Sequence, residues 1–181
     1  MDVSGLVTRV ALIGLPGSGK STIGRQLARL WSMRFVDADH VVEQRIGCSI
    51  REFFEREGEQ AFRDMESQVI DELSASTSSL LLSTGGGVVL REQNRRHLHA
   101  RTPVFYLDCT PEAIAARLVK DGMRVAIVDI NQEAAVAAAE ELAGQYGADT
   151  MAVQCDVSQE EQVNTAVQKV LERFGTVDVL V

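Results

Sequence analysis

The segment Gly14–Ser21 has the residue types and the spacing that bind phosphate groups. It reads Gly-Leu-Pro-Gly-Ser-Gly-Lys-Ser, which fills every fixed position of a phosphate-binding loop. An apolar run precedes it and a run with helical periodicity follows it, as the loop requires. Backbone N–H groups freed by the glycines, with the positive end of the helix, form a nest for anions. The alternative is a glycine-rich turn that carries a lysine by chance.

The polar groups of this loop predict separate contacts with Mg-ATP or Mg-ADP. Lys20 would reach the outer phosphates, and Ser21 would offer its hydroxyl to Mg²⁺. The nucleotide-binding residues expected here are Gly14, Gly17, Ser18, Gly19, Lys20, Ser21 and Thr22.

Two aspartates, Asp37 and Asp39, follow the second apolar run. If both end a strand, their spacing of two places them on one face. In an α/β sheet that face opens into the ligand crevice. One carboxylate would then hold a metal-bound water, and the other would accept a hydrogen bond from a substrate hydroxyl. The alternative for Asp39 is that it caps the following helix.

The composition is that of an ordinary globular protein. The chain has 181 residues, 45% of them hydrophobic, which suffices for one domain or one and a small piece. We expect no membrane association, because no apolar run approaches the ~18 residues of a membrane span and the start does not resemble a signal peptide. Three scattered cysteines predict reduced thiols and a cytoplasmic location. The net charge of −8 argues against nucleic acid as a partner.

The charge is unevenly distributed. Residues 1–118 carry a net charge of −1, and residues 119–181 carry −7. Arginine is frequent up to Arg117 and rare afterwards, where alanine and valine become abundant. Such a shift is weak support for a boundary, because solvated acidic helices are common.

Strand and helix patterns alternate along the whole chain, which predicts a three-layer α/β/α fold with a mainly parallel sheet. The expected strands are 9–13, 34–37, 80–83, 104–108, 125–130, 151–155 and 177–181. The expected helices are 20–31, 39–46, 49–75, 92–100, 111–120, 132–146 and 159–174. We expect the long third helix to break near Gly58, and Ser158 and Glu161 to form a capping box for the last one.

Further motifs lie within the first 118 residues. Gly58-Glu59 precedes Phe62-Arg63, and Thr84-Gly85-Gly86-Gly87 directly follows an apolar run. Together with the phosphate loop and the aspartates, the series reads GxxGxGKST, FxDxD, GExxFR and TGGG across residues 9–118. This series resembles the shikimate kinases, a family of P-loop kinases. The resemblance implies ATP-dependent phosphorylation of the 3-hydroxyl of shikimate with Mg²⁺ as cofactor.

The resemblance also implies a role for individual residues. Ser21 and Asp37 would serve the metal, and Lys20 and Asp39 would be catalytic, with Asp39 also contacting the ring hydroxyls of shikimate. The remaining roles are binding roles: Arg63 for the shikimate carboxylate, Gly85, Gly86 and Gly87 for the acceptor pocket, and Arg117 for adenine.

Two of these assignments have alternatives. A guanidinium fork suits a carboxylate, but Arg63 could instead be a helix arginine paired with Glu59 or Glu66. Arg117 could equally be a helix-surface residue.

After Arg117 the sequence departs from the family pattern, which continues with a lid carrying Arg-Pro-Leu-Leu and a helix carrying a second carboxylate-binding arginine. Arg124 has the spacing of the lid arginine, but Val125-Ala126-Ile127 follows it and no proline follows Pro111. Arg173, near the end of the last predicted helix, has the wrong context for the second arginine.

From about residue 116 the chain resembles a fragment of a short-chain dehydrogenase, in segments 116–131, 155–158 and 174–181. Asp129 has the position of the acid that binds the NAD ribose, but the glycine fingerprint for the pyrophosphate is absent. We therefore expect a chimera: a shikimate-kinase-like part over residues 1–118 and a Rossmann-like part over 119–181, in one continuous sheet.

Three functions follow, from different classes. The first is a shikimate-kinase-type phosphotransferase, weakened by the missing lid and arginine, with ATP or ADP and weakly bound shikimate as partners. The second is an engineered chimeric scaffold that binds nucleotide without turnover. The third, an NAD(P)-dependent oxidoreductase, is disfavoured by the missing glycine fingerprint. The sequence does not predict an oligomeric state.

Overall fold

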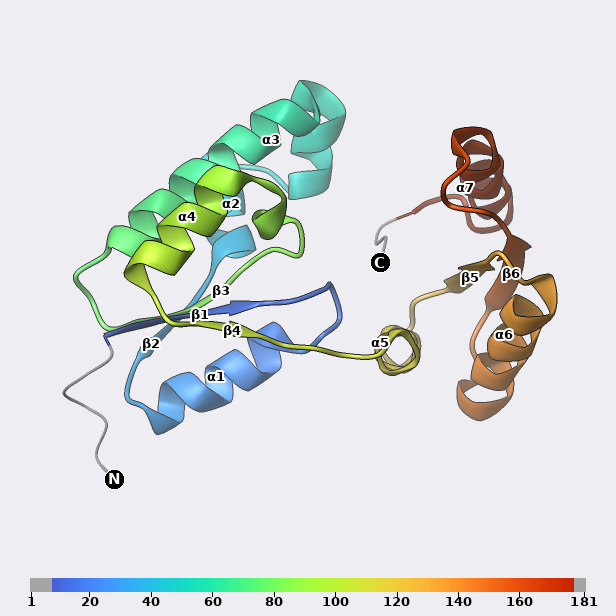
Figure 1. Cartoon of the computed structure of the whole chain (residues 1–181), viewed down its shortest axis with the longest axis horizontal. Coiled ribbons are helices and arrows are strands. Elements are labelled where there is room, and N and C mark those ends of the chain that lie inside the picture. The colour runs from blue at the N-terminus through green and yellow to red at the C-terminus, as the bar shows by residue number, and fades with distance from the viewer. Residues whose placement is uncertain (1–7, 178–181) are drawn as a thin grey trace. The chain divides into compact units, whose positions relative to one another are not determined.

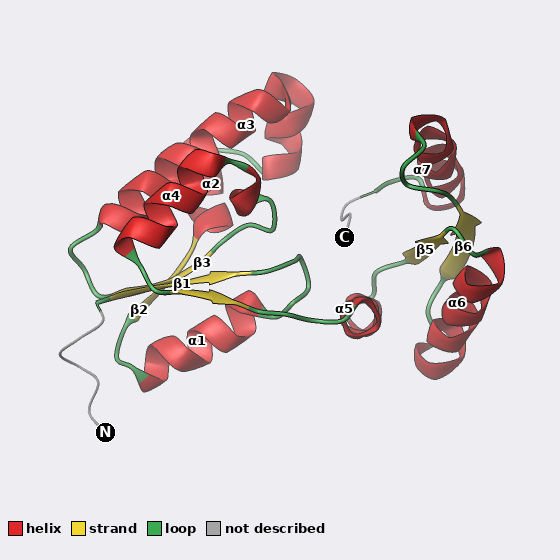
Figure 2. Ribbon diagram, in the orientation of Figure 1, coloured by secondary structure: helices red, strands yellow, loops and turns green. Residues whose placement is uncertain are grey.

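The computed structural model describes residues 8–177 and forms two compact units, Met1–Asp108 and Cys109–Val181. Strands and helices alternate through both (Figures 1 and 2). The boundary falls ten residues before the expected one at 118, because the helix that follows it packs with the second unit. Of the strand expected over 177–181, only Val177 lies among the described residues.

The first unit contains a parallel sheet with strand order β2-β3-β1-β4. Its strands are β1 (Arg9–Ile13), β2 (Arg34–Asp37), β3 (Leu80–Ser83) and β4 (Val104–Tyr106). Its helices are α1 (Lys20–Leu30), α2 (Ala38–Ile46), α3 (Ile50–Ala75), the 3₁₀ segment η1 (Val88–Leu90) and α4 (Glu92–Arg101). Figure 1 shows α1 on one face of this sheet and α2, α3 and α4 on the other. The expected three-layer arrangement with a parallel sheet is confirmed for this unit.

Strand β3 shows why the sheet is covered on both faces. Leu80 and Leu82 belong to the core that includes residues of α2, α3 and α4. Leu81, between them, belongs to the core that includes residues of α1. All three are fully buried. A continuous apolar run is the pattern of a parallel strand buried on two faces.

The strand order places the predicted motifs at one edge of the sheet. In the register of the sheet, Ser83 on β3 lies beside Leu12 on β1 and beside Asp37 on β2. The carboxyl ends of parallel strands share one edge, where ligands bind in open α/β sheets. The loops that follow these three strands therefore converge.

Helix α3 breaks at Gly58, as expected. Gly58 has φ 82° and ψ 172° inside an otherwise helical segment, a conformation that favours glycine. The break starts a second helical segment that carries Phe62 and Arg63 along the sheet. Ser49 and Glu52 form a capping box at the start of α3.

The second unit contains two parallel strands, β5 (Val125–Asp129) and β6 (Thr150–Gln154). Its helices are α5 (Pro111–Lys120), α6 (Gln132–Tyr146) and α7 (Glu160–Phe174). Residues of α5 and α6 form one core with β5, and residues of α7 form another with β6. In the second unit β5 and β6 pair with each other in a sheet of two strands, and the single continuous sheet expected from the sequence stays a prediction.

The capping box predicted for the last helix is wrong. Gln159 is the N-cap of α7 and makes no side-chain cap. Ser158 instead donates from N and Oγ to Asp156 Oδ1, at 2.9 and 2.7 Å. These two hydrogen bonds hold Ser158 in a local turn. Such a turn competes with capping of the helix.

No helix among residues 8–177 combines the length and the apolar character that a membrane crossing requires.

Candidate active site

The phosphate loop lies between β1 and α1, and its backbone has the conformation that its glycines allow. Gly17 has φ 75°, and Gly19, the N-cap of α1, has φ 95°. Residues with a side chain rarely adopt such left-handed angles. Ser18 N donates to Leu15 O at 3.1 Å, which closes the turn. The expected strand–loop–helix context is present.

Lys20 lies over the loop that it follows. Its Nζ donates to Gly14 O and to Leu15 O, both at 2.8 Å, and the residue is 8% exposed. Burial lowers the pKa of Lys20, while the Asp39 and Asp37 carboxylates act in the opposite direction. The ammonium group is therefore held at the mouth of the loop by carbonyl groups that it can exchange for phosphate oxygens.

Ser18 provides a test of whether the loop fits phosphate. Its Oγ is buried and has no hydrogen-bond partner among the described residues. A buried hydroxyl without a partner is unusual and calls for an explanation. A phosphate oxygen in the loop would supply the missing acceptor. Thr22, by contrast, is exposed on the first turn of α1.

Ser21 and Asp37 are joined directly. Ser21 Oγ donates to Asp37 Oδ2 at 2.9 Å and lies 3.5 Å from Ser83 Oγ. Among the described residues, no group of three or more His, Cys, Asp or Glu side chains could hold a metal ion. The hydroxyl of Ser21 and the carboxylate of Asp37 are oxygen groups of the kind that Mg²⁺ combines with substrate phosphates and water.

Asp37 and Asp39 do not share a strand, which corrects the expectation from the sequence. Strand β2 ends at Asp37, and α2 begins at the next residue. Asp37 is the N-cap of α2, and its Oδ1 accepts a hydrogen bond from Asp39 N at 3.2 Å. The free N–H groups of a helix start need an acceptor, and the strand connects to the helix without a loop. The helix is therefore capped by Asp37, and Asp39 lies in its first turn.

Asp39 lies in an acidic and largely buried environment. Burial, followed by the Asp37 and Glu66 carboxylates, raises the pKa of Asp39 to about 6. Lys20 acts in the opposite direction. A carboxyl group with such a pKa can accept and release a proton near neutral pH. This is the property that a general base needs.

The three glycines of the TGGG motif contact three parts of the site. A Cβ atom on Gly85 would lie 2.6 Å from Asp39 Oδ1, and one on Gly86 would lie 2.6 Å from Pro16 Cδ. A Cβ on Gly87 would lie 2.5 Å from Arg63 Nη1. Real Cβ atoms do not approach this closely. At Gly86 the neighbour is the rigid ring of Pro16, whereas at Gly85 and Gly87 the ends of the Asp39 and Arg63 side chains would have to shift. The loop brings together the phosphate loop, α2 and α3.

Arg63 makes the ion pairs that were its alternative role, and its contact with the shikimate carboxylate stays a prediction. Its Nη1 donates to Glu66 Oε2 at 3.1 Å and its Nε to Glu59 Oε1 at 3.3 Å. Its side chain also lies against Gly87. The ion pairs thus hold the guanidinium group beside the three-glycine loop.

Glu66 and Pro16 are site residues that sequence reasoning did not assign. Glu66 is 2% exposed, and burial raises its pKa against the effect of Arg63. The spacing of Glu66 three residues after Arg63 was a usable signal. Pro16 touches Gly86 across a long sequence separation, which no local pattern predicts.

Arg117 belongs to the second unit, on α5. Its Nη1 donates to Cys109 Sγ at 3.2 Å. The contact with adenine stays a prediction. Asp129 Oδ1 accepts a hydrogen bond from Asn131 N at 2.8 Å, in a turn at the end of β5.

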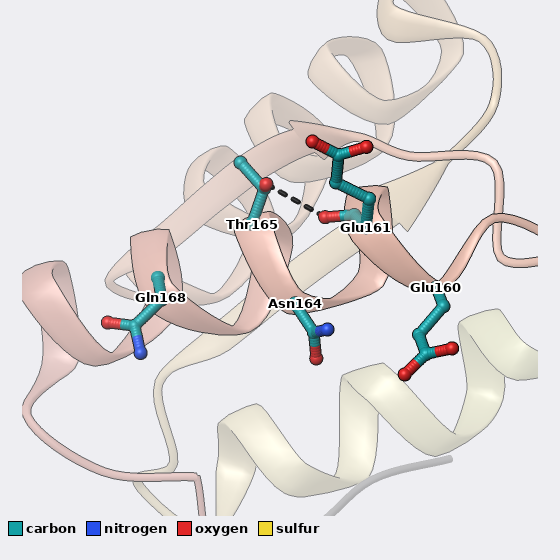
Figure 3. Close-up of a pocket in the computed structure, with 5 residues that line it drawn as sticks. All are labelled: Glu160, Glu161, Asn164, Thr165 and Gln168. Carbon is teal, nitrogen blue, oxygen red and sulfur yellow. Dashed lines mark hydrogen bonds between the residues drawn. The ribbon is translucent and has the colours of Figure 1, made fainter.

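A surface depression of the second unit is lined by one helix. Its residues are Glu160, Glu161, Asn164, Thr165 and Gln168, all on α7 (Figure 3). Thr165 Oγ1 donates to Glu161 O at 2.8 Å, within the helix. None of the predicted site residues lines this depression, so it adds nothing to the candidate active site.

Comparisons with known proteins show which family this chain is similar to. The family model for shikimate kinase matches residues 16–174. The shikimate kinase of Paracidovorax citrulli is 56% identical over 116 residues, which are 64% of this chain and 63% of that protein. That of Pasteurella multocida is 48% identical over 121 residues, which are 67% of this chain and 69% of that protein.

Two solved structures are similar to this chain over more than nine tenths of its length. A structure of Acinetobacter baumannii shikimate kinase in complex with shikimate has a TM-score of 0.61 at 28% identity, covering 94% of both chains. Shikimate kinase from Aquifex aeolicus has a TM-score of 0.57 at 28% identity, covering 92% of this chain and 96% of that one. The matches beyond residue 118 give no support to a dehydrogenase fragment. The chain belongs to the shikimate kinase family.

Proposed function

We propose that this chain transfers the γ-phosphoryl group of ATP to the 3-hydroxyl of shikimate. The observation that carries the proposal is the position of the three-glycine loop. It contacts the phosphate loop at Pro16, the carboxylate of Asp39 and the guanidinium group of Arg63. The three-glycine loop thus lies against a donor site, a base and a carboxylate-binding cation.

The donor half of the site is built from the phosphate loop and the start of α1. The nest of backbone N–H groups would hold the phosphates of ATP or ADP, and Ser18 Oγ would gain its missing partner. Lys20 would exchange the carbonyls of Gly14 and Leu15 for the outer phosphates. Ser21 and Asp37 would hold Mg²⁺, Asp37 through a water. Bound Mg²⁺ neutralises charge on the transferring phosphoryl group.

The acceptor half is built from α2, α3 and the three-glycine loop. Arg63 would bind the carboxylate of shikimate, held in place by Glu59 and Glu66. Asp39 would accept the proton of the attacking hydroxyl, for which its raised pKa is suited. Phosphoryl transfer relies on positioning and charge stabilisation, and these residues supply both.

We propose further that turnover is weak, because residues 119–177, the part of this segment that the structure describes, do not supply a lid. Arg124 directly precedes β5, and its guanidinium group lies over the Phe174 ring, 5.3 Å from its centroid. Arg173 Nη2 donates to Asp149 Oδ1 at 2.6 Å. Both arginines are engaged within the second unit. The second candidate function is a nucleotide-binding scaffold without turnover, in which this segment has a different origin from the rest of the chain.

Calorimetric titration separates the two candidates. Mg-ADP should bind to the wild-type protein, and shikimate should bind more weakly to the Mg-ADP complex. Arg63→Ala should abolish the binding of shikimate and leave that of Mg-ADP unchanged. Arg56→Ala, which removes an exposed arginine of the same helix, is the control. Binding of Mg-ADP without any binding of shikimate would favour the scaffold, and absence of both would overturn the proposal.

A further inference from the structure

Asn94 is buried, yet only the nitrogen of its side-chain amide has a hydrogen-bond partner among the described residues. It lies on α4 with 0% exposure, and its Nδ2 donates to Val88 O at 3.0 Å. Its Oδ1 is buried and has no partner among the described residues. A buried unpaired acceptor lowers stability relative to an apolar side chain of similar size. Stability alone therefore does not explain an asparagine at this position.

The acceptor of this hydrogen bond, Val88, directly follows the three-glycine loop. Val88 N donates to Gly85 O at 3.3 Å, and Leu90 N donates to Gly87 O at 3.0 Å. The segment η1 is thus hydrogen-bonded to the loop, and the positions of the two are coupled. The loop can shift only if η1 shifts with it.

Helix α4 holds η1 through two consecutive residues. Besides the Asn94 bond to Val88, Arg95 Nη1 donates to Val89 O and Leu90 O at 2.6 and 3.0 Å. Side chains of α4 thus bind three carbonyl groups in succession. At the other end of the loop, Thr84 N and Oγ1 both donate to Leu12 O, at 3.1 Å each.

We infer that Asn94 is a positioning residue for phosphoryl transfer: through Val88 it fixes the three-glycine loop against Asp39 and Arg63. This inference rests on the proposed function. The loop approaches both side chains so closely that a small displacement would change the acceptor site, and misplacement by about 1 Å can cost ~10²-fold in rate. Asn94 touches none of the reacting groups and acts only through the loop.

The test compares Asn94→Leu with Thr102→Val. Thr102 is also buried, and its Oγ1 donates to Leu98 O at 2.9 Å, at the opposite end of α4. Each variant removes one buried side-chain-to-carbonyl hydrogen bond, but only Asn94→Leu affects the loop. In Asn94→Leu, amide hydrogen exchange of Val88 and Leu90 should accelerate by about five- to tenfold, the equivalent of one hydrogen bond. The shikimate affinity should fall by a similar factor, and the Mg-ADP affinity far less.

Thr102→Val should change neither the exchange of these amides nor the shikimate affinity. Unchanged exchange in Asn94→Leu would overturn the inference, and so would faster exchange with unchanged shikimate affinity. If Asn94→Leu does not fold, the exposed Arg95→Ala should show the same two changes. If the wild-type protein binds no shikimate, the proposed function fails, and the exchange measurement alone decides whether Asn94 holds the loop.

Discussion

Gly86 lies against the ring of Pro16, so close that a methyl group at position 86 would be 2.6 Å from Cδ and 2.9 Å from Cγ. Pro16 belongs to the phosphate loop and Gly86 to the three-glycine loop. Since proline is rigid, neither loop can move towards the other. The contact fixes the distance between the nucleotide phosphates and the acceptor pocket.

Gly86→Ala should therefore disturb both halves of the site. The methyl group would force the loops apart, at a cost of about 1–3 kcal/mol in the free energy of unfolding. We expect weaker binding of both Mg-ADP and shikimate in calorimetric titrations. Gly144→Ala is the matched control, because Gly144 lies within α6 and a Cβ there meets no atom within 4 Å. That variant should gain about 0.5–1 kcal/mol. Normal ligand binding by Gly86→Ala would refute the role of the contact.

Lys20→Ala should abolish most nucleotide binding without unfolding the protein. The ammonium group makes charge-assisted hydrogen bonds to the phosphates, and its loss should cost about 2–3 kcal/mol in the free energy of binding. Burial already disfavours the charged form of this lysine, so the melting temperature should change little. Isothermal titration with Mg-ADP measures the affinity, with the exposed Lys169→Ala as control. Equal affinities would show that the loop does not bind phosphate.

Asp37→Asn should remove the dependence of nucleotide binding on Mg²⁺. Asparagine caps helices as well as aspartate does, so the cap of α2 and the stability should persist. The negative charge that would hold a metal-bound water is lost. Titrations with ADP in the presence of Mg²⁺ or of a chelator should differ for the wild-type protein and agree for the variant. A variant that retains the full difference would place the metal elsewhere.

Asp39→Asn should stabilise the ligand-free protein above pH 6. The pKa of Asp39 is raised from 3.8 to about 6 in the folded state, so between these values the folded protein binds more protons than the unfolded chain. Stability then falls as the pH rises through this window. Asparagine removes the effect, with a gain on the order of 1–3 kcal/mol at pH 7 and almost none at pH 3.5. Urea denaturation at several pH values measures it. A gain that does not depend on pH would contradict the raised pKa.

The sequence predicted the elements of this fold well because their patterns are local. The apolar run of β3 is buried on both sides, and the glycines of the phosphate loop lie between a strand and a helix, as their types require. One local prediction was wrong: Ser158 was expected to cap α7, but it donates to Asp156, two residues earlier. The long-range contacts were not predictable. The phosphate loop and the three-glycine loop were both recognised, but the contact between Pro16 and Gly86 depends on the strand order.

The site was predicted residue by residue, but not its geometry. Asp37 and Asp39 were expected on one strand face, whereas the chain turns into α2 between them and Asp37 becomes the cap. Arg63 was given two alternatives: the structure shows its ion pairs with Glu59 and Glu66, and its contact with the shikimate carboxylate stays a prediction. We infer that the buried Asn94 acts through Val88, and a single sequence carries little signal for such a role.

The most direct test of the account is ³¹P NMR of the protein with Mg-ATP, with and without shikimate. The account predicts a new phosphomonoester signal only when shikimate is present, formed well below the ~1–100 s⁻¹ typical of kinases and lost in Asp39→Asn. Free inorganic phosphate should form slowly in both samples, because water reaches a site without a lid. ATP that remains intact in both samples, or phosphate release that shikimate does not redirect, would contradict the account.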